Sequence, residues 1–233
     1  TLPEPPPPSL TPEDLPLNIL YEDDDLLAVN KPPGMSTHPP KTAGTGTLAN
    51  ALAFHIRTLS NFHQDPTRVG IVHRLDRDTS GVILCAKDEW VHRRIARQFQ
   101  RREITKHYVA IVFGIVEAER FTVEEPVGRD PDHRERVRID AEEGREAVTE
   151  FVVRERLGGR LRSTDDQRPG RRYRGGYSLL DCHPKTGRTH QLRVHLQHAR
   201  HPILADEWYA TDRQTPTWGE FGQEAPSDAG PTY

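Results

Sequence analysis

The sequence has few cysteines and no long apolar run. Its two cysteines among 233 residues, Cys85 and Cys182, both stand in apolar contexts. This pattern predicts buried thiols outside any disulfide, which fit a reducing compartment, and we expect a cytoplasmic protein. No apolar stretch approaches the ~18 residues of a membrane span, and we expect no signal peptide. No spacing of cysteine and histidine resembles a zinc site, so we expect no bound metal.

The net charge of −3 conceals an uneven distribution. Residues 1–25 carry seven acidic side chains and no Lys or Arg, and residues 207–233 carry five acidic side chains and one Arg. Residues 26–206 therefore hold 31 of the 32 basic and 23 of the 35 acidic side chains. Such a basic centre suits a polyanionic partner such as RNA or DNA, although ordinary charge for solubility explains it equally well.

Proline marks the beginning of the chain. Residues 1–16 hold seven prolines and predict an extended, acidic linker or tail. We expect the folded domain to occupy residues 17–233. Its final part, from about residue 211, is rich in Gly, Pro and Asp and is expected to be irregular.

Apolar periodicity predicts the elements of this domain. Strands are expected at residues 26–30, 81–86, 106–114, 147–155 and 177–182. Helices are expected at residues 47–59, 89–101 and 190–199, the last of them capped by Thr189. Strands outnumber helices and do not alternate with them regularly, which favours an α+β fold.

Two basic segments lie on or between these elements. In the helix over residues 89–101, one face is apolar (Val91, Ile95 and Phe99), and four arginines occupy other faces (Arg93, Arg94, Arg97 and Arg101). Residues 158–176 are rich in Gly and Arg and predict a loop. A solvated loop and a contact with a nucleic acid backbone are both open for this segment.

The segment HRLDRDTSG, residues 73–81, concentrates charge in a short turn. Such a turn needs no function, because Asp, Thr and Ser side chains bond to local backbone groups. However, Arg74 and Arg77 flank Asp76 and are expected to hold its carboxylate in the ionised form. An ionised, positioned carboxylate can act as a nucleophile. The apolar Leu75 indicates that the turn is packed against the protein.

The segment HPKTGRTHQLRVHL, residues 183–196, gathers histidines and arginines. A metal site is disfavoured, because the histidine spacing places no pair on one helical face beside a carboxylate. A basic patch that includes Arg188 and Arg193 fits better. Arg193 lies in the first turn of the predicted helix, where the helix dipole disfavours a cation. A specific anionic partner, such as an Asp side chain, is therefore expected for Arg193.

One aromatic residue is notable on a predicted strand. Tyr108 shares a side of the strand over residues 106–114 with Ala110 and Val112. A tyrosine in this position more often packs in the sheet than serves a site, and its hydroxyl needs a hydrogen-bond partner if it is buried.

Four segments in order resemble the motifs of the RluA-type RNA pseudouridine synthases. The signature itself is HRLDRDTSGVIL, residues 73–84. The other three are YEDDDLLAVNKPPGMSTHP (21–39), KHYVAIVFG (106–114) and KTGRTHQLRVHLQHARHPILAD (185–206). Four ordered motifs are more specific than any one alone. We find neither the S4-like RNA-binding domain nor the later Leu-His-Ala run that this family often carries.

The resemblance implies a pseudouridine synthase fold, α+β, with a mixed and mainly antiparallel central sheet flanked by helices and loops around a catalytic cleft. It implies isomerisation of uridine to pseudouridine in structured RNA, with ribosomal RNA as the favoured substrate and transfer RNA as the other candidate. The reaction needs no cofactor, and a monomer is expected.

The resemblance also assigns residues. It makes Asp76 the catalytic carboxylate, Tyr108 the active-site tyrosine and Arg193 the salt-bridge partner of Asp76, and it does not require Asp78. Arg74 is expected to help displace the target base and replace it. Further contacts with RNA or uridine are expected from Lys31, His73, Thr79, Arg188, His190 and Gln191, and phosphate contacts from Lys31, the helix over 89–101 and the loop over 158–176.

Three questions stay open at this point. Asp76 either attacks the sugar or abstracts a sugar proton. A non-catalytic RNA-binding protein or RNA chaperone on the same fold is the main alternative. A glycoside hydrolase that uses Asp76 and Asp78 is disfavoured, because the pair is too close in sequence to flank a sugar and the nearby arginines would lower both pKa values.

Overall fold

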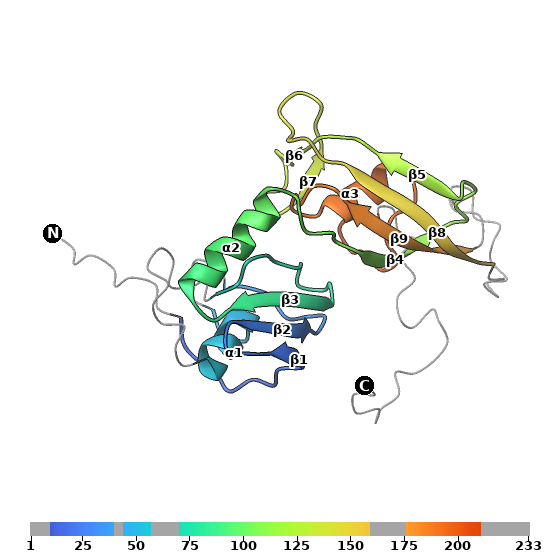
Figure 1. Cartoon of the computed structure of the whole chain (residues 1–233). Coiled ribbons are helices and arrows are strands. Elements are labelled where there is room, and N and C mark those ends of the chain that lie inside the picture. The colour runs from blue at the N-terminus through green and yellow to red at the C-terminus, as the bar shows by residue number, and fades with distance from the viewer. Residues whose placement is uncertain (1–9, 40–43, 57–69, 159–175, 211–233) are drawn as a thin grey trace. The chain divides into compact units, whose positions relative to one another are not determined.

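The computed structural model describes residues 10–39, 44–56, 70–158 and 176–210, which belong to two compact units (Figure 1). The first unit is Thr1–Ile104 and the second is Thr105–Tyr233. The loop expected over residues 158–176 and the irregular segment expected from residue 211 lie almost wholly outside the described residues. A single catalytic domain over residues 17–233 stays a prediction.

A three-stranded antiparallel sheet forms the centre of the first unit. Its strands are β1 (Ile19–Glu22), β2 (Leu26–Lys31) and β3 (Gly81–Ala86), with β2 in the middle (Figure 1). The strands predicted at 26–30 and 81–86 are confirmed. The sequence did not predict β1, because all four of its residues are exposed and so show no alternation between buried and polar positions.

Helix α1 (Leu48–His55) begins where the sequence predicted. The Thr47 hydroxyl caps it and accepts from the backbone N–H of Asn50. The helix ends earlier than predicted, because Ile56 leaves the helical conformation. The described end of the predicted tail contacts this helix, since the Glu13 N–H donates to the Asn50 carbonyl (3.1 Å) and the Asn50 side-chain amide donates to the Thr11 carbonyl (2.8 Å).

Helix α2 (Glu89–Gln100) confirms the second predicted helix, and it contacts β3. The Asp88 carboxylate caps its first turn and accepts from the N–H groups of Trp90 (2.7 Å) and Val91 (3.0 Å). The predicted apolar face is half-buried. No helix among the described residues is long and apolar enough to cross a membrane.

The second unit contains a four-stranded and a two-stranded sheet, and every strand pairing within them is antiparallel (Figure 1). The larger sheet has the order β4 (Tyr108–Phe113), β9 (Tyr177–Pro184), β8 (Thr149–Leu157) and β5 (Arg120–Val123). The smaller sheet pairs β6 (Val127–Arg129) with β7 (Val137–Ile139). Strands β4, β8 and β9 confirm predictions. Strands β5, β6 and β7 are only three or four residues long and were not predicted.

Helix α3 (Gln191–His198) packs on the larger sheet and closes its core. Leu196 is fully buried in one cluster with Phe151, Leu180 and Cys182, and Leu192 and Ala199 pack against that cluster, as predicted. The predicted cap at Thr189 is wrong. The residue before the helix is His190, in a left-handed conformation with φ of 51°, and its side chain makes no capping hydrogen bond.

Both cysteines are buried thiols, as predicted. Cys85 lies on β3 and Cys182 on β9, and neither side chain is exposed to solvent. Burial raises the pKa of each thiol to about 12, because the thiolate would lose its hydration. Neither residue is therefore a nucleophile at neutral pH.

Lys31, the last residue of β2, is completely buried. Its ammonium group donates to three backbone carbonyls: Pro32 (2.7 Å), Met35 (2.8 Å) and Arg77 (2.9 Å). These three bonds use all three donors of the ammonium group. Lys31 thus ties the turn after β2 to the segment before β3, which lies 46 residues further along the chain.

The Lys31→Met variant should be strongly destabilised. Methionine fills similar space but leaves three carbonyls without a donor, so the free energy of unfolding should fall by about 3 kcal/mol. Urea denaturation of both proteins measures this difference. Lys87→Met is the matched control, because Lys87 pairs with Glu22 near the surface and should contribute under ~1 kcal/mol. Equal losses in the two variants would contradict the role given to Lys31.

Stability should also depend on pH through His195 of α3, which is fully buried. Its Nε2 lies 3.0 Å from the Glu125 carbonyl, which can only accept, so this nitrogen carries the proton and Nδ1 accepts from the Thr149 hydroxyl. Burial lowers the pKa of the His195 imidazole. Below about pH 6.5 the unfolded chain therefore binds a proton that the folded protein does not, and stability falls by up to ~1.4 kcal/mol per pH unit.

Chemical denaturation from pH 7 to pH 5 tests this dependence. The stability advantage of the native protein over His195→Gln should shrink as the pH falls. Gln197→Ala, a change on the same helix at a side chain with no titratable group, should keep the native pH profile over the same range. Parallel profiles for the native protein and His195→Gln would show that His195 has no such effect.

Candidate functional site

Asp76 lies in the segment between residues 72 and 80, which leads into β3, and the backbone on both sides of it is fixed. Before it, Leu75 is buried, and the Thr37 hydroxyl donates to the Leu75 carbonyl (2.8 Å) and accepts from its N–H (3.3 Å). After it, the Arg77 carbonyl accepts from buried Lys31. The Thr79 N–H closes the turn onto the Asp76 carbonyl (3.1 Å). The prediction that this turn is packed is confirmed.

His73 joins the same segment to its surroundings. Its Nε2 accepts from the Leu84 N–H (3.0 Å) on β3, so the proton of a neutral ring lies on Nδ1. The imidazole also stacks on the Phe99 ring of α2, with 4.8 Å between ring centres. His73 therefore fixes the Asp76 segment to a strand and to a helix, and its contact with RNA stays a prediction.

The arginines of the HRLDRD sequence flank Asp76. Arg77 forms its ion pair with Asp78 (3.2 Å), and the expectation that Arg74 and Arg77 hold Asp76 in the ionised form stays a prediction. Both members of this pair are largely exposed, and a pair of that kind contributes little to stability. Arg74 is exposed, whereas Asp76 is half-buried. The two aspartates therefore differ in their surroundings: Asp78 is exposed, whereas Asp76 is half-buried and its backbone is fixed on both sides.

Two residues that were expected to touch RNA are interior residues. Lys31 uses its ammonium group on three carbonyls, so its predicted phosphate contact is wrong. Gln191 is buried, and its side-chain oxygen Oε1 accepts from the Thr186 hydroxyl (2.8 Å) and the Arg188 N–H (2.9 Å). Its amide donates to Thr149 (2.9 Å). Gln191 therefore shapes the turn before α3, and its predicted RNA contact is also wrong.

Alternation along β2 indicates from the sequence that Lys31 points inward. Leu27, Val29 and Lys31 are two residues apart and are all buried. In a strand, residues at this spacing point to the same face. A lysine in register with two buried apolar residues is expected to point inward.

Arg193 of α3 has the anionic partner that its position required. The Asp206 carboxylate accepts from Arg193 Nε (2.6 Å) and Nη2 (2.8 Å), and it is nearly buried. Asp206 also accepts from the N–H groups of Trp208 (3.0 Å) and Tyr209 (3.1 Å). The guanidinium lies over both rings, 5.1 and 4.8 Å from their centres.

The bonds to Asp206 involve two of the five N–H donors of Arg193. They fix the plane of the guanidinium from one side. The predicted salt bridge between Arg193 and Asp76 would join the two units, and it stays a prediction.

Tyr108 begins β4, opposite Cys182 of β9. It is partly buried and packs against the cluster that contains Leu180 and Leu196. The structure therefore gives Tyr108 the packing position that its strand predicted. Its position in a catalytic site stays a prediction.

The remaining residues near α3 are held within the second unit. His190 Nδ1 lies 2.9 Å from the Tyr209 hydroxyl, and the Arg188 Nε donates to the Glu146 carbonyl (3.0 Å). The other histidines of this segment lie in different surroundings: His195 is buried, whereas His183 stacks on His107. In the part of the chain that the structure describes, no three His, Cys, Asp or Glu side chains form a metal-binding group.

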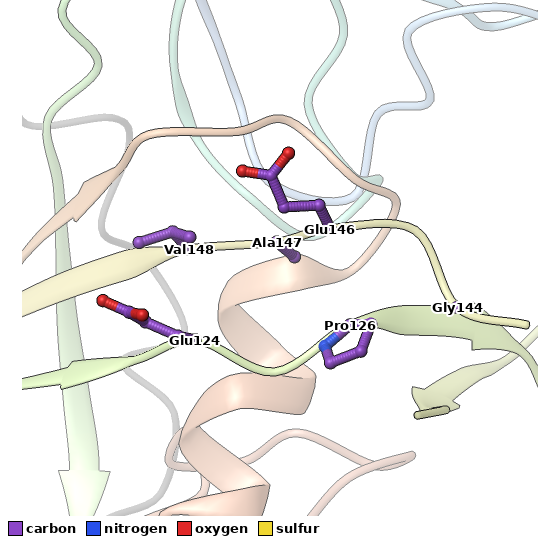
Figure 2. Close-up of a pocket in the computed structure, with 6 residues that line it drawn as sticks. All are labelled: Glu124, Pro126, Gly144, Glu146, Ala147 and Val148. Carbon is purple, nitrogen blue, oxygen red and sulfur yellow. The ribbon is translucent and has the colours of Figure 1, made fainter. Parts of the chain in front are cut away.

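Figure 2 shows a hollow in the second unit that contains none of the predicted site residues. Its lining includes the carboxylates of Glu124 and Glu146 and the apolar side chains of Pro126, Ala147 and Val148. Two carboxylates repel a phosphate backbone, so this hollow does not suit RNA.

Comparison with known proteins agrees with the motifs. A model of the RNA pseudouridylate synthase family matches residues 25–198. An uncharacterized RNA pseudouridine synthase of Chlorobaculum parvum is 43% identical over 218 residues, covering 91% of this chain and 62% of that protein. A ribosomal large subunit pseudouridine synthase D of Borreliella burgdorferi is 39% identical over 201 residues, covering 86% of this chain and 56% of that protein. The chain thus spans about three fifths of the length of the curated relatives it matches.

Solved structures share the fold. Human RNA pseudouridylate synthase domain containing 1 superposes with a TM-score of 0.63 at 26% identity, over 84% of this chain and 70% of that chain. Human RNA pseudouridylate synthase domain containing 4 gives 0.60 at 26% identity, over 85% and 71%. The predicted α+β pseudouridine synthase fold with antiparallel sheets is confirmed. The family model, the relatives and the ordered motifs agree that this chain belongs to the RluA-type RNA pseudouridine synthases.

Proposed function

We propose that this protein isomerises uridine to pseudouridine in RNA and that Asp76 is its catalytic carboxylate. The observation that carries the proposal is the fixed backbone around Asp76: Thr37 holds the residue before it and Lys31 holds the residue after it. Catalysis needs a reacting group within a fraction of an ångström of its working position. Asp78, two residues away, is exposed and paired with Arg77.

The proposed reaction is a rearrangement that balances without a cofactor. The bond from N1 of uracil to C1′ of the ribose breaks, the base rotates, and C5 bonds to C1′. C5 loses a proton and N1 gains one, so the reaction involves neither oxidation nor net hydrolysis. Asp76 either attacks the sugar or removes a sugar proton, and both routes need the carboxylate form.

Two residues of the second unit complete the proposed site. Tyr108 stacks on the uracil and helps to remove the C5 proton as a general base. Arg193 keeps Asp76 ionised and oriented, and Asp206 supports this role because it holds the guanidinium plane. The target nucleotide must leave its stack to be reached, and exposed Arg74 is suited to occupy the space it leaves.

Ribosomal RNA is the substrate we propose, and transfer RNA is the alternative. The support is similarity to several proteins named ribosomal large subunit pseudouridine synthase D, at 36–39% identity. A second candidate function is RNA binding without catalysis, which the basic composition of residues 26–206 also suits.

The Asp76→Ala variant separates these functions. It should lose pseudouridine formation by at least about 1,000-fold while binding RNA almost as tightly as the native protein. The assay is tritium release from uridines labelled at C5, in transcripts of bacterial large-subunit ribosomal RNA and, separately, of transfer RNA. Asp78→Ala is the matched control and should react within about threefold of the native rate.

Urea denaturation of both variants shows whether the turn still folds. Native-like turnover by Asp76→Ala would exclude Asp76 as the catalytic carboxylate. A native protein that binds both RNA classes but releases no tritium from either would favour the non-catalytic function.

A further inference from the structure

Helix α2 has two opposite faces. Val91, Ile95 and Phe99 form the half-buried face, and Phe99 contacts His73. On the other side lie four residues spaced by four, three and four positions, which an α-helix of 3.6 residues per turn places in one narrow line. These four residues, named here the Trp–Arg stripe, are Trp90, Arg94, Arg97 and Arg101, the last at the C-cap.

The Trp–Arg stripe is exposed and positively charged. All four of its side chains are exposed, and 63% of Trp90 is accessible to solvent. The acidic residue of the helix, Glu89, pairs with Arg93 outside the stripe (2.6 Å). Arg101 approaches Glu103 only at 3.7 Å. Across the described residues, no carboxylate pairs with Arg94 or Arg97, so these two guanidinium groups present positive charge that the described residues do not pair.

Trp90 is held in place although it is exposed. The Asp88 cap fixes its backbone N–H (2.7 Å), and the Arg94 guanidinium lies 4.5 Å from the centre of its ring. A cation over one face of a tryptophan is attracted by the ring, which restrains the side chain at little cost in burial. Trp90 nevertheless stays 63% accessible to solvent, and an exposed tryptophan in a fixed position is suited to stack on a planar group.

A single strand of RNA matches both features of the stripe. Its phosphates match a row of arginines, and its unpaired bases are planar groups that stack on aromatic side chains. From Trp90 to Arg101 the stripe covers 12 residues, roughly 16 Å along the helix axis, which suits a few nucleotides. A duplex would offer phosphates to the arginines, but its bases are already stacked on one another.

We propose that the Trp–Arg stripe binds a single-stranded segment of the RNA substrate, with a base stacked on Trp90 and phosphates against Arg94, Arg97 and Arg101. The inference rests on the proposed function and names a substrate contact away from the reacting uridine. The stack of His73 on Phe99 joins α2 to the segment that contains Asp76 within the same unit. A strand held by α2 is therefore placed relative to Asp76.

Binding of short RNA by the full chain tests the base-stacking part. The probes are a fluorescein-labelled oligouridylate of about 12 nucleotides and an RNA duplex of equal length, followed by fluorescence anisotropy. Trp90→Ala should weaken oligouridylate binding by at least about fivefold and affect the duplex less. Trp90→Tyr keeps an aromatic ring and should bind nearly as the native protein does.

The salt dependence of binding tests the phosphate part. Changing Arg94, Arg97 and Arg101 together to Gln should make the negative slope of log binding constant against log salt less steep by about 2. The reason is that single strands release ~0.7 counterion per phosphate contact. The matched variant with Lys at the same three positions keeps the charge and should keep the slope.

Each outcome bears on one proposal at a time. An unchanged slope in the Gln variant, equal losses for oligouridylate and duplex in Trp90→Ala, or no native binding of oligouridylate would overturn the stripe. None of these measurements needs turnover. Failure of tritium release would therefore count against the proposed catalysis and leave the binding result to be judged by itself.

Discussion

Lys31 places a positive charge where water does not reach it, and the segment that contains Asp76 depends on that charge. Removing an ammonium group from water is costly, and burial accordingly lowers the pKa of Lys31. Three carbonyls compensate, and the negative charges of Asp78 and Asp76 raise the pKa again. Because the three carbonyls converge on one nitrogen, the turn after β2 and the segment before β3 cannot move independently.

The second unit is organised around a buried carboxylate, whereas the first is organised around a buried ammonium group. Asp206 is nearly buried and gathers four N–H groups: two from the Arg193 guanidinium and the backbone groups of Trp208 and Tyr209. Trp208 and Tyr209 also place their rings under the guanidinium. Each unit thus fixes its proposed catalytic group, Asp76 or Arg193, through contacts of its own.

Periodicity in the sequence predicted the longer elements and failed for the short ones. Strands β2, β3, β4, β8 and β9 and helix α2 show apolar runs or apolar residues at periodic spacing in the sequence, so pattern alone placed them. Strand β1 is exposed along its whole length and is held by its pairing with β2, which a local pattern does not report. Thr189 is a good capping residue by type, but the backbone turns at His190 in a left-handed conformation instead.

The site was harder to predict than the fold. Lys31 and Gln191 are polar, and residue type alone suggests a surface role, whereas tertiary contacts bury both of them. Arg77 forms an ion pair with the neighbouring Asp78, since both side chains are exposed on the same turn. Asp76, Tyr108 and Arg193 are far apart in sequence and belong to two units. The proposal that they form one catalytic site therefore comes from the ordered motifs and not from local pattern.

The two buried thiols have a practical consequence. The sequence contains no cysteine besides Cys85 and Cys182, and a thiol with a pKa of about 12 reacts slowly with alkylating reagents at neutral pH. A cysteine introduced at an exposed position of α2 would therefore be modified far faster than the native pair. The folded protein is thus already suited to attaching a single probe or cross-linker on the helix proposed to bind RNA, with no need to remove a native cysteine first.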